Sequence, residues 1–146
     1  MKVLLDSNVW IAGLIARGTC AELIDHCLVE HQLPISDWIS KEIIEVLTTR
    51  FEYPLDRIRE VESWLRDVAD LFRLDGDPPN ICRDPDDNYV LLTAYQVEAA
   101  CIVTGDRDLL DLKRFEGISV VLPNAFWQLE HRLEMKRRDK ENPDKM

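Results

Sequence analysis

Two short apolar runs, each followed directly by acidic residues, constrain the fold of this chain most strongly. Residues 3–5 (VLL) lead into DSN at 6–8, and residues 102–104 (IVT) lead into GDRD at 105–108. Short apolar runs bounded by turn residues are typical of strands buried on both faces of a parallel sheet. Parallel strands end at one shared edge, where ligands bind. Carboxylates from distant segments should therefore meet there, and because they repel one another unless a cation lies between them, we expect a divalent metal ion.

The rest of the sequence alternates strand-like and helix-like segments, which predicts a three-layer α/β fold around a five-stranded parallel sheet. Strands are expected at residues 2–6, 33–35, 71–74, 101–104 and 118–122. With 146 residues in all, one domain is expected over residues 1–133. Residues 134–146 are almost entirely charged or polar, so we expect them to form a disordered or frayed tail.

The formal charge of −10 argues against a protein that coats nucleic acid with a broad basic face. It leaves open an enzyme that acts on nucleic acid, because a bound metal ion neutralises local carboxylates and contacts phosphate itself. Scattered basic residues offer a local cationic surface, although each one is equally well explained as a solvated charge. These residues are Arg17, Arg50, Arg57, Arg59, Arg107, Lys113 and Arg114.

Cysteine and histidine usage argues against a zinc site. The four cysteines form no CxxC pair, and the three histidines show no spacing typical of zinc ligands. The cysteines are therefore expected to be free thiols in a reducing compartment. The chain enters its first strand at once, without a targeting signal, and its longest apolar stretch is too short to span a bilayer. We expect a cytoplasmic protein that is not bound to a membrane.

Asp6 and Glu42 are the first two candidate site residues. Asp6 ends the first strand, where the alternative explanation is a simple helix cap. Glu42 lies on a predicted helix whose apolar face includes Trp38 and Val46, and it falls inside that face, whereas Glu45 falls outside it. A carboxylate turned toward the core needs a partner. That partner is either an arginine or a metal ion shared with Asp6.

The other candidate residues lie at a helix start and at the end of the fourth strand. Asp84 is expected to cap a helix that opens with proline, and Asp87, one turn further on, is expected to face the sheet edge. Asp106 and Asp108 follow the fourth strand; one is expected to cap a short helix and the other to bind metal. The hydroxyl of Thr104 is placed to orient a carboxylate or a water molecule.

Together these acids form an oxygen-only ligand set carried by four elements. Such a set suits Mg²⁺ or Mn²⁺ and not zinc or copper. Hard cations held in this way commonly activate water for attack on a phosphodiester.

Four segments resemble the PIN domain: VLLDSNVWIAGL, WISKEIIEVL, RDPDDNYVLLTA and VTGDRDLL. The resemblance is strongest to the prokaryotic branch related to VapC-type toxins of toxin–antitoxin pairs, and it covers about residues 1–133. It implies a five-stranded parallel sheet and a metal-dependent endoribonuclease. It also implies an RNA substrate and a small antitoxin partner, and members of this branch often form homodimers.

The resemblance also implies a role for each candidate acid. Asp6, Glu42, Asp87 and Asp106 match the four catalytic acids of the family, and Asp108 matches a frequent additional acid. The implied mechanism holds Mg²⁺ or Mn²⁺ on Asp6, Asp87 and Asp106, with Glu42 and Asp108 binding water or a second ion.

Two alternatives remain at this point. A Mg²⁺-dependent phosphatase of the haloacid-dehalogenase type would need an aspartate two residues after Asp6, where this chain has Asn8, and a lysine after a late strand. A non-catalytic module would use the same acids only to hold a structural ion or to bind a basic partner.

Overall fold

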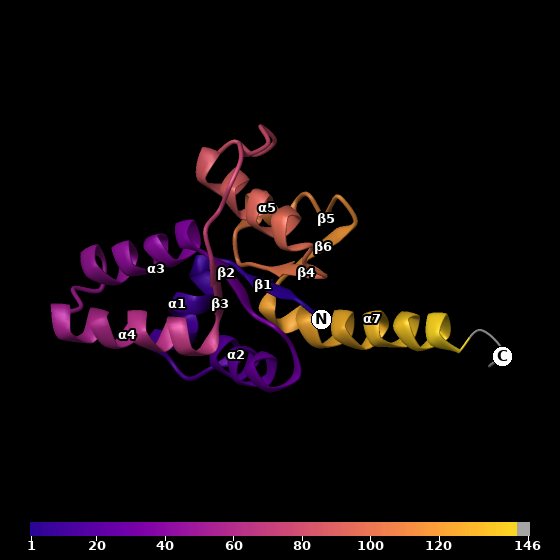
Figure 1. Cartoon of the computed structure of the whole chain (residues 1–146), viewed down its shortest axis with the longest axis horizontal. Coiled ribbons are helices and arrows are strands. Elements are labelled where there is room, and N and C mark those ends of the chain that lie inside the picture. Colours follow the sequence, from indigo (N-terminus) through magenta and orange to yellow (C-terminus); the bar gives the residue numbers. More distant parts are fainter. Residues whose placement is uncertain (143–146) are drawn as a thin grey trace.

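The computed structural model describes residues 1–142 of the chain. Its elements in chain order are β1 (Val3–Leu5), α1 (Ser7–Ile15), α2 (Thr19–Glu30), β2 (Pro34–Ser36), α3 (Asp37–Thr49), α4 (Leu55–Val68), β3 (Asp70–Phe72), α5 (Pro85–Val97), β4 (Cys101–Val103), α6 (Arg107–Leu110), β5 (Arg114–Phe115), β6 (Ile118–Val121), the 3-10 helix η1 (Pro123–Ala125) and α7 (Phe126–Glu141). Figure 1 shows α5 on one side of the strands and α2 with α7 on the other, while α3 and α4 form a helical hairpin beside them. The expected three-layer α/β class is confirmed.

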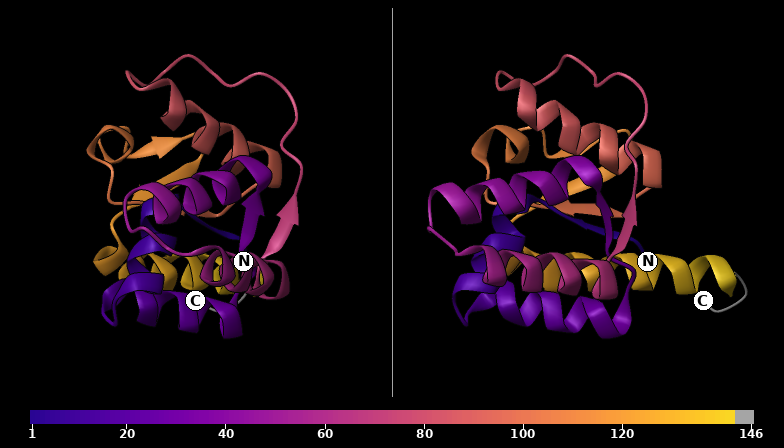
Figure 2. Two further views of the ribbon diagram at one scale, coloured as in Figure 1. Left: turned by 90° about the vertical axis from the view of Figure 1, so that its left-hand side faces the viewer. Right: turned by 60° about the vertical axis from the view of Figure 1, so that its left-hand side comes forward.

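The sheet differs from the expected single sheet of five parallel strands. The main sheet has four strands in the order β1-β4-β6-β5, of which β5 is antiparallel to β6, and β2 pairs only with β3. One bridge, between Lys2 and Gln32, connects the two sheets. The separation has a physical cause, because β2 begins at Pro34, which has no N–H to continue a ladder toward β1. Figure 2 shows the pair β2-β3 set apart from the other strands.

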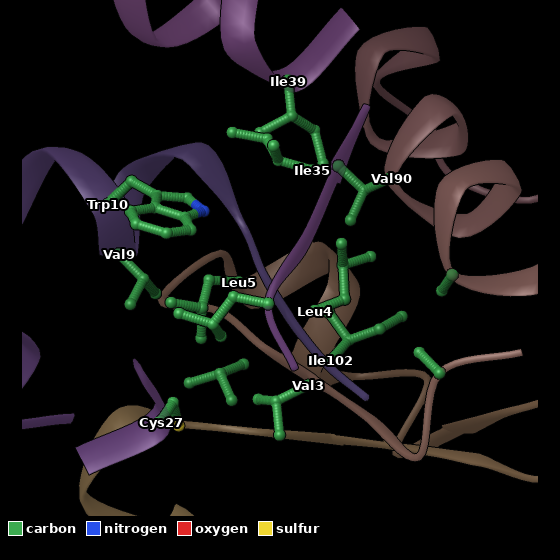
Figure 3. Packing of buried hydrophobic residues seen from close by; sticks show 14 of the residues in the cluster. Val3, Leu4, Leu5, Val9, Trp10, Cys27, Ile35, Ile39, Val90 and Ile102 are labelled. Carbon is green, nitrogen blue, oxygen red and sulfur yellow. The ribbon is translucent and has the colours of Figure 1, made fainter. Parts of the chain in front are cut away.

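The core explains why the central strands are apolar throughout. All residues of β1 and β4 are fully buried, as are Trp10, Ile35 and Ile39 from the surrounding elements. Figure 3 shows Trp10 and Ile39 directed toward the strands from α1 and α3. Helices α1 and α2 approach each other closely at Gly13, where a Cβ atom would come within 2.4 Å of Ile24. The start of α1 is joined to the end of β4 by hydrogen bonds from the Asp6 N–H to the Val103 carbonyl and from the Gly105 N–H to Asn8 Oδ1.

The expected disordered tail is wrong for residues 134–141, because α7 continues to Glu141. These residues are mainly Glu, Lys, Arg and Met, which have high helix propensity, and Arg137 pairs with Glu141 one turn later at 3.1 Å. This end of α7 projects from the rest of the protein (Figure 1). Its high charge and polarity therefore reflect an exposed helix and not disorder. Residues 143–146, the rest of that predicted tail, lie outside the described residues. None of the helices within residues 1–142 has the length and apolar character that crossing a membrane requires.

Candidate metal centre

One cavity of about 730 Å³ collects acids from four separate parts of the chain. Asp6, Glu42, Asp87 and Asp106 all line it. They come from the end of β1, from α3, from the first turn of α5 and from the segment after β4. Asp84 and Asp86 also border the cavity, whereas Asp108 does not.

Asp6 is held in place from several directions. It is 4% exposed and caps α1, and its Oδ1 accepts a hydrogen bond from the Ser7 N–H at 2.8 Å. Its Oδ2 accepts from Thr104 Oγ1 at 2.7 Å and from Asn8 Nδ2 at 3.0 Å. Burial raises the pKa of Asp6 despite these hydrogen bonds, and the negative charge of Asp106 raises it further. The hydrogen bond expected from Thr104 to a carboxylate is present.

The side chain of Ser7 lies between Glu42 and Asp6 and contacts both. The hydroxyl of Ser7 donates to Glu42 Oε1 and lies 3.5 Å from Asp6 Oδ1. Among the described residues, Glu42 has no arginine partner, which removes the simpler of its two expected explanations. Burial raises the pKa of Glu42, and the charge of Asp6 adds to this effect. Glu45 is exposed, as expected, although it reaches the edge of the same cavity.

Asp87 is buried at the first turn of α5. It is 7% exposed, and its Oδ2 is buried without any hydrogen-bond partner. Burial raises the pKa of Asp87 to about 8, with further contributions from the Asp106 carboxyl and from the charges of Asp84 and Asp6. The helix start explains its position, because Asp84 caps α5 by accepting from the Asp86 N–H at 3.0 Å and Pro85 follows. A buried carboxylate oxygen without a donor calls for a partner, and a cation is one kind of partner that satisfies it.

The expected division of roles, with one of Asp106 and Asp108 as helix cap and the other as metal ligand, is wrong. Asp106 caps α6, its Oδ1 accepting from the Asp108 N–H at 2.9 Å, and it also lines the cavity. Asp108 instead accepts a 2.6 Å hydrogen bond from Arg83 Nη2 at the surface. Carboxylate oxygens of Asp87, Asp106 and Asp108 nevertheless lie within 4.8 Å of one another, close enough to share an ion.

The donor chemistry fits a hard divalent cation. The salt bridges of residues 1–142 leave all four cavity acids without a Lys, Arg or His partner. Every donor is a carboxylate oxygen, which Mg²⁺ and Mn²⁺ prefer. A cation bound there would counter both causes of the raised pKa values of Asp6, Glu42 and Asp87, which are burial first and mutual repulsion second. Asp6 and Glu42 are not members of the triad of Asp87, Asp106 and Asp108, but they line the same cavity as Asp87 and Asp106.

Three supporting residues were missed at the level of sequence. Ser7 links Asp6 with Glu42, and Asn8 joins the two strand ends, since its Oδ1 accepts from the Gly105 N–H at 3.1 Å. Asn88 Oδ1 accepts from the N–H groups of Ile81 and Cys82, which ties the loop before α5 to that helix. The only sequence signal for them is their position next to acids at element ends.

Comparison with known proteins shows which family the chain belongs to. The model of the PIN domain matches residues 2–108. This chain belongs to the PIN-domain family. An uncharacterized protein of Methanocaldococcus jannaschii is 32% identical over 119 residues, which cover 77% of this chain and 76% of that protein.

Solved structures share the fold of this PIN-domain protein. VapBC2 from Rickettsia felis, bound to a DNA fragment from its promoter, matches with a TM-score of 0.59 at 10% identity, covering 82% of this chain and 97% of that one. VapBC-1 from nontypeable Haemophilus influenzae matches with a TM-score of 0.59 at 15% identity, covering 85% and 99%. FitAcB from Neisseria gonorrhoeae matches with a TM-score of 0.56 at 16% identity, covering 83% and 97%. At these identities the likeness is one of fold.

Proposed function

We propose that this PIN-domain protein is a Mg²⁺- or Mn²⁺-dependent endoribonuclease that hydrolyses RNA phosphodiester bonds. The observation that carries the proposal is the unpartnered, buried Oδ2 of Asp87 beside Asp106, in a cavity that Asp6 and Glu42 also line. Keeping four acids together without a basic partner costs stability, and a structural role alone gives no reason for it. Buried, perturbed acids in a cavity are typical of functional sites.

The donors assigned to the ion are Asp6, Asp87 and Asp106, with Glu42 and Asp108 binding water or a second ion. A divalent ion bound there would supply positive charge for the scissile phosphate and acidify a water molecule. The chain itself supplies orientation. Thr104 and Asn8 fix Asp6, Ser7 fixes Glu42, and the N–H of Asp108 fixes Asp106.

Basic residues at the cavity suit a phosphate backbone. Lys41 and Arg50 line the same cavity on the α3 side, and both are exposed. We assign them to contacts with the phosphates that flank the cleaved bond, since Lys and Arg side chains contact phosphate oxygens in nucleic-acid complexes. A local basic rim of this kind is compatible with the net charge of −10.

We further propose that the protein is the toxin of a toxin–antitoxin pair, acts in the cytoplasm and binds a small antitoxin protein. The sequence resembles the VapC-type branch, and VapBC complexes share its fold. A homodimer is part of the same proposal. Co-expression with the product of a neighbouring short reading frame tests whether an antitoxin copurifies with this protein. Light scattering of the purified material then gives its molar mass and tests for the homodimer.

The nuclease proposal is tested with tag-free protein, total cellular RNA and Mn²⁺. Wild-type protein is expected to cut RNA, and Asp6→Asn or Asp106→Asn is expected to abolish cleavage while circular dichroism shows an unchanged fold. Glu42→Gln and Glu45→Gln form a matched pair one turn apart on α3. The first should lose activity, whereas the second should keep it. Full activity in Asp6→Asn or Asp106→Asn would refute the assignment.

A chelator separates catalysis from the non-catalytic alternative. If EDTA removes cleavage while the fold persists, the ion serves the reaction. If EDTA unfolds the protein and wild type shows no cleavage after Mn²⁺ is restored, the acids hold a structural ion and the nuclease proposal fails.

A further inference from the structure

A second cluster of ligand-type side chains joins helices α2 and α7. His26 Nε2 and His31 Nε2 each lie 2.5 Å from the same carboxylate oxygen, Oε2 of Glu130. The histidines are 104 and 99 residues away from Glu130 in the sequence. Tertiary packing alone brings the three together, which is why their spacing along the chain is not typical of zinc ligands.

The local backbone explains how two histidines five positions apart face one point. His26 lies within α2, but His31 is the residue that ends it, with extended backbone angles (φ −139°, ψ −178°). The chain leaves the helix there, so the ring of His31 is free to turn back toward Glu130. The three side chains are 29%, 4% and 14% exposed respectively, so the cluster is mostly enclosed but reachable at His26.

The donor set has the composition of a transition-metal site. Two imidazole nitrogens and one carboxylate oxygen are ligands that Zn²⁺ accepts in tetrahedral geometry, with bonds of about 2.0–2.2 Å. Tetrahedral bonds of that length separate donor atoms by about 3.3 Å. Each imidazole nitrogen lies 2.5 Å from Glu130 Oε2, and all three donor atoms lie within 4.8 Å of one another, so each nitrogen needs to move away from the oxygen by less than about 1 Å to admit an ion. We propose that His26, His31 and Glu130 bind Zn²⁺ or a similar transition-metal ion and thereby pin α7 to α2.

Surrounding groups hold the two rings in orientation. The ring centroids of Trp127 and His26 lie 4.8 Å apart, and those of Phe126 and His31 lie 6.0 Å apart. Both pairs pack edge to face. The amino group of Met1 lies 3.4 Å from His31 Nδ1, the ring nitrogen that carries the proton when Nε2 binds an ion. The hydrogen bonds from both histidines lower the pKa of Glu130 against the opposing effect of burial, which keeps this ligand ionised.

This site is independent of the acidic cavity. None of its three residues lines that cavity, and its donors include nitrogen whereas the cavity offers oxygen. Excess Mg²⁺ should therefore occupy the acidic cavity and leave the histidine cluster free for a softer ion. The two sites can be measured separately for this reason.

The test is a titration of tag-free protein with Co²⁺, in excess Mg²⁺, read by visible absorption, and a parallel measurement of thermal unfolding with Zn²⁺. Wild type should develop the visible band of tetrahedral Co²⁺, and Zn²⁺ should raise Tm. His26→Ala should weaken Co²⁺ binding by more than about 100-fold, because loss of a merely supporting residue already costs about 10- to 100-fold. His131→Ala, the exposed histidine next to Glu130, is the matched control and should bind as wild type does.

Glu130→Gln keeps the shape of the side chain and is the second test variant if His26→Ala does not fold. It should weaken Co²⁺ binding by at least about tenfold. Absence of a tetrahedral Co²⁺ band in wild type overturns the proposal and leaves an ion-paired cluster in its place. Equal binding by wild type and by a folded His26→Ala or Glu130→Gln variant overturns it as well.

Discussion

Thr104 Oγ1 donates a 2.7 Å hydrogen bond to Asp6 Oδ2, across 98 residues of sequence and between the ends of β4 and β1. The same hydroxyl oxygen accepts from the Asp106 N–H at 3.0 Å. One fully buried side chain therefore positions two of the acids in the cavity. The strand pairing of β1 with β4 makes this possible, because it aligns the two strand ends.

Replacement of this hydroxyl should damage the site more than the fold. Thr104→Val keeps the volume but removes both hydrogen bonds, and we expect a cost of about 1–3 kcal/mol in the free energy of unfolding. Cleavage of RNA should fall by about 10- to 100-fold, since the groups that orient ligands matter to this extent. Thr104→Ser retains the hydroxyl and is the control. Cleavage by Thr104→Val at the rate of wild type would show that the hydrogen bonds do not serve the site.

The metal-free protein should lose stability as pH rises. Burial raises the pKa of Asp87 from 3.8 to about 8, so between these values the folded protein holds a proton that the unfolded chain has released. The free energy of unfolding therefore falls with increasing pH across this window, by up to about 1.4 kcal/mol per unit, and levels off above it. Asp6 and Glu42 act in the same direction.

Urea unfolding in EDTA from pH 4 to 9 measures this slope. Asp87→Asn should flatten it and should be more stable than wild type at pH 8, although inactive as a nuclease. Asp86→Asn, an exposed neighbour in the same turn, should keep most of the slope. Added Mn²⁺ should restore stability to wild type at high pH but not to Asp87→Asn. A wild-type stability that rises toward pH 8 without metal would contradict this prediction.

Asp108 should contribute less than Asp106. Its Oδ1 is already bonded to Arg83, and it does not line the cavity, whereas Asp106 does. We expect Asp108→Asn to reduce cleavage by about tenfold, the range of a supporting group, and Asp106→Asn to abolish it. Initial rates at saturating Mn²⁺ compare the two. Equal losses would place Asp108 among the direct ligands.

The projecting end of α7 should be dispensable for folding. All residues of 136–142 are exposed, so truncation after Met135 should change the free energy of unfolding by less than about 1 kcal/mol. Leu129, in the same helix but 4% exposed, is the contrast, and Leu129→Ala should cost about 2–5 kcal/mol. Chemical denaturation of the two variants checks the difference. A truncated protein that fails to fold would show that this end packs on another part of the chain.

Sequence patterns predicted most of the main chain, because the relevant signals are local. Apolar runs gave β1 and β4, and Asp84 followed by Pro85 gave the start of α5. The convergence of Asp6, Asp87 and Asp106 on one edge followed from parallel strand order. Glu42 followed from the face of its helix.

The remaining features depend on contacts between distant segments. The separation of β2 and β3 from the main sheet depends on whether β1 and β2 continue to pair after the Lys2–Gln32 bridge. Strand β5 has only two residues, so it carries no periodic signal. The meeting of His26 and His31 with Glu130 depends on where α2 ends and where α7 packs. Apolarity and spacing do not encode either relationship.

The central claim is that the acids of the cavity hold a divalent cation. Anomalous diffraction from crystals soaked in Mn²⁺ tests it most directly. Wild-type crystals should show a Mn²⁺ peak within about 2.4 Å of carboxylate oxygens of Asp87 and Asp106, and the peak should disappear in Asp87→Asn. A cavity that stays without a peak in wild-type crystals, at Mn²⁺ concentrations that support RNA cleavage, would contradict it.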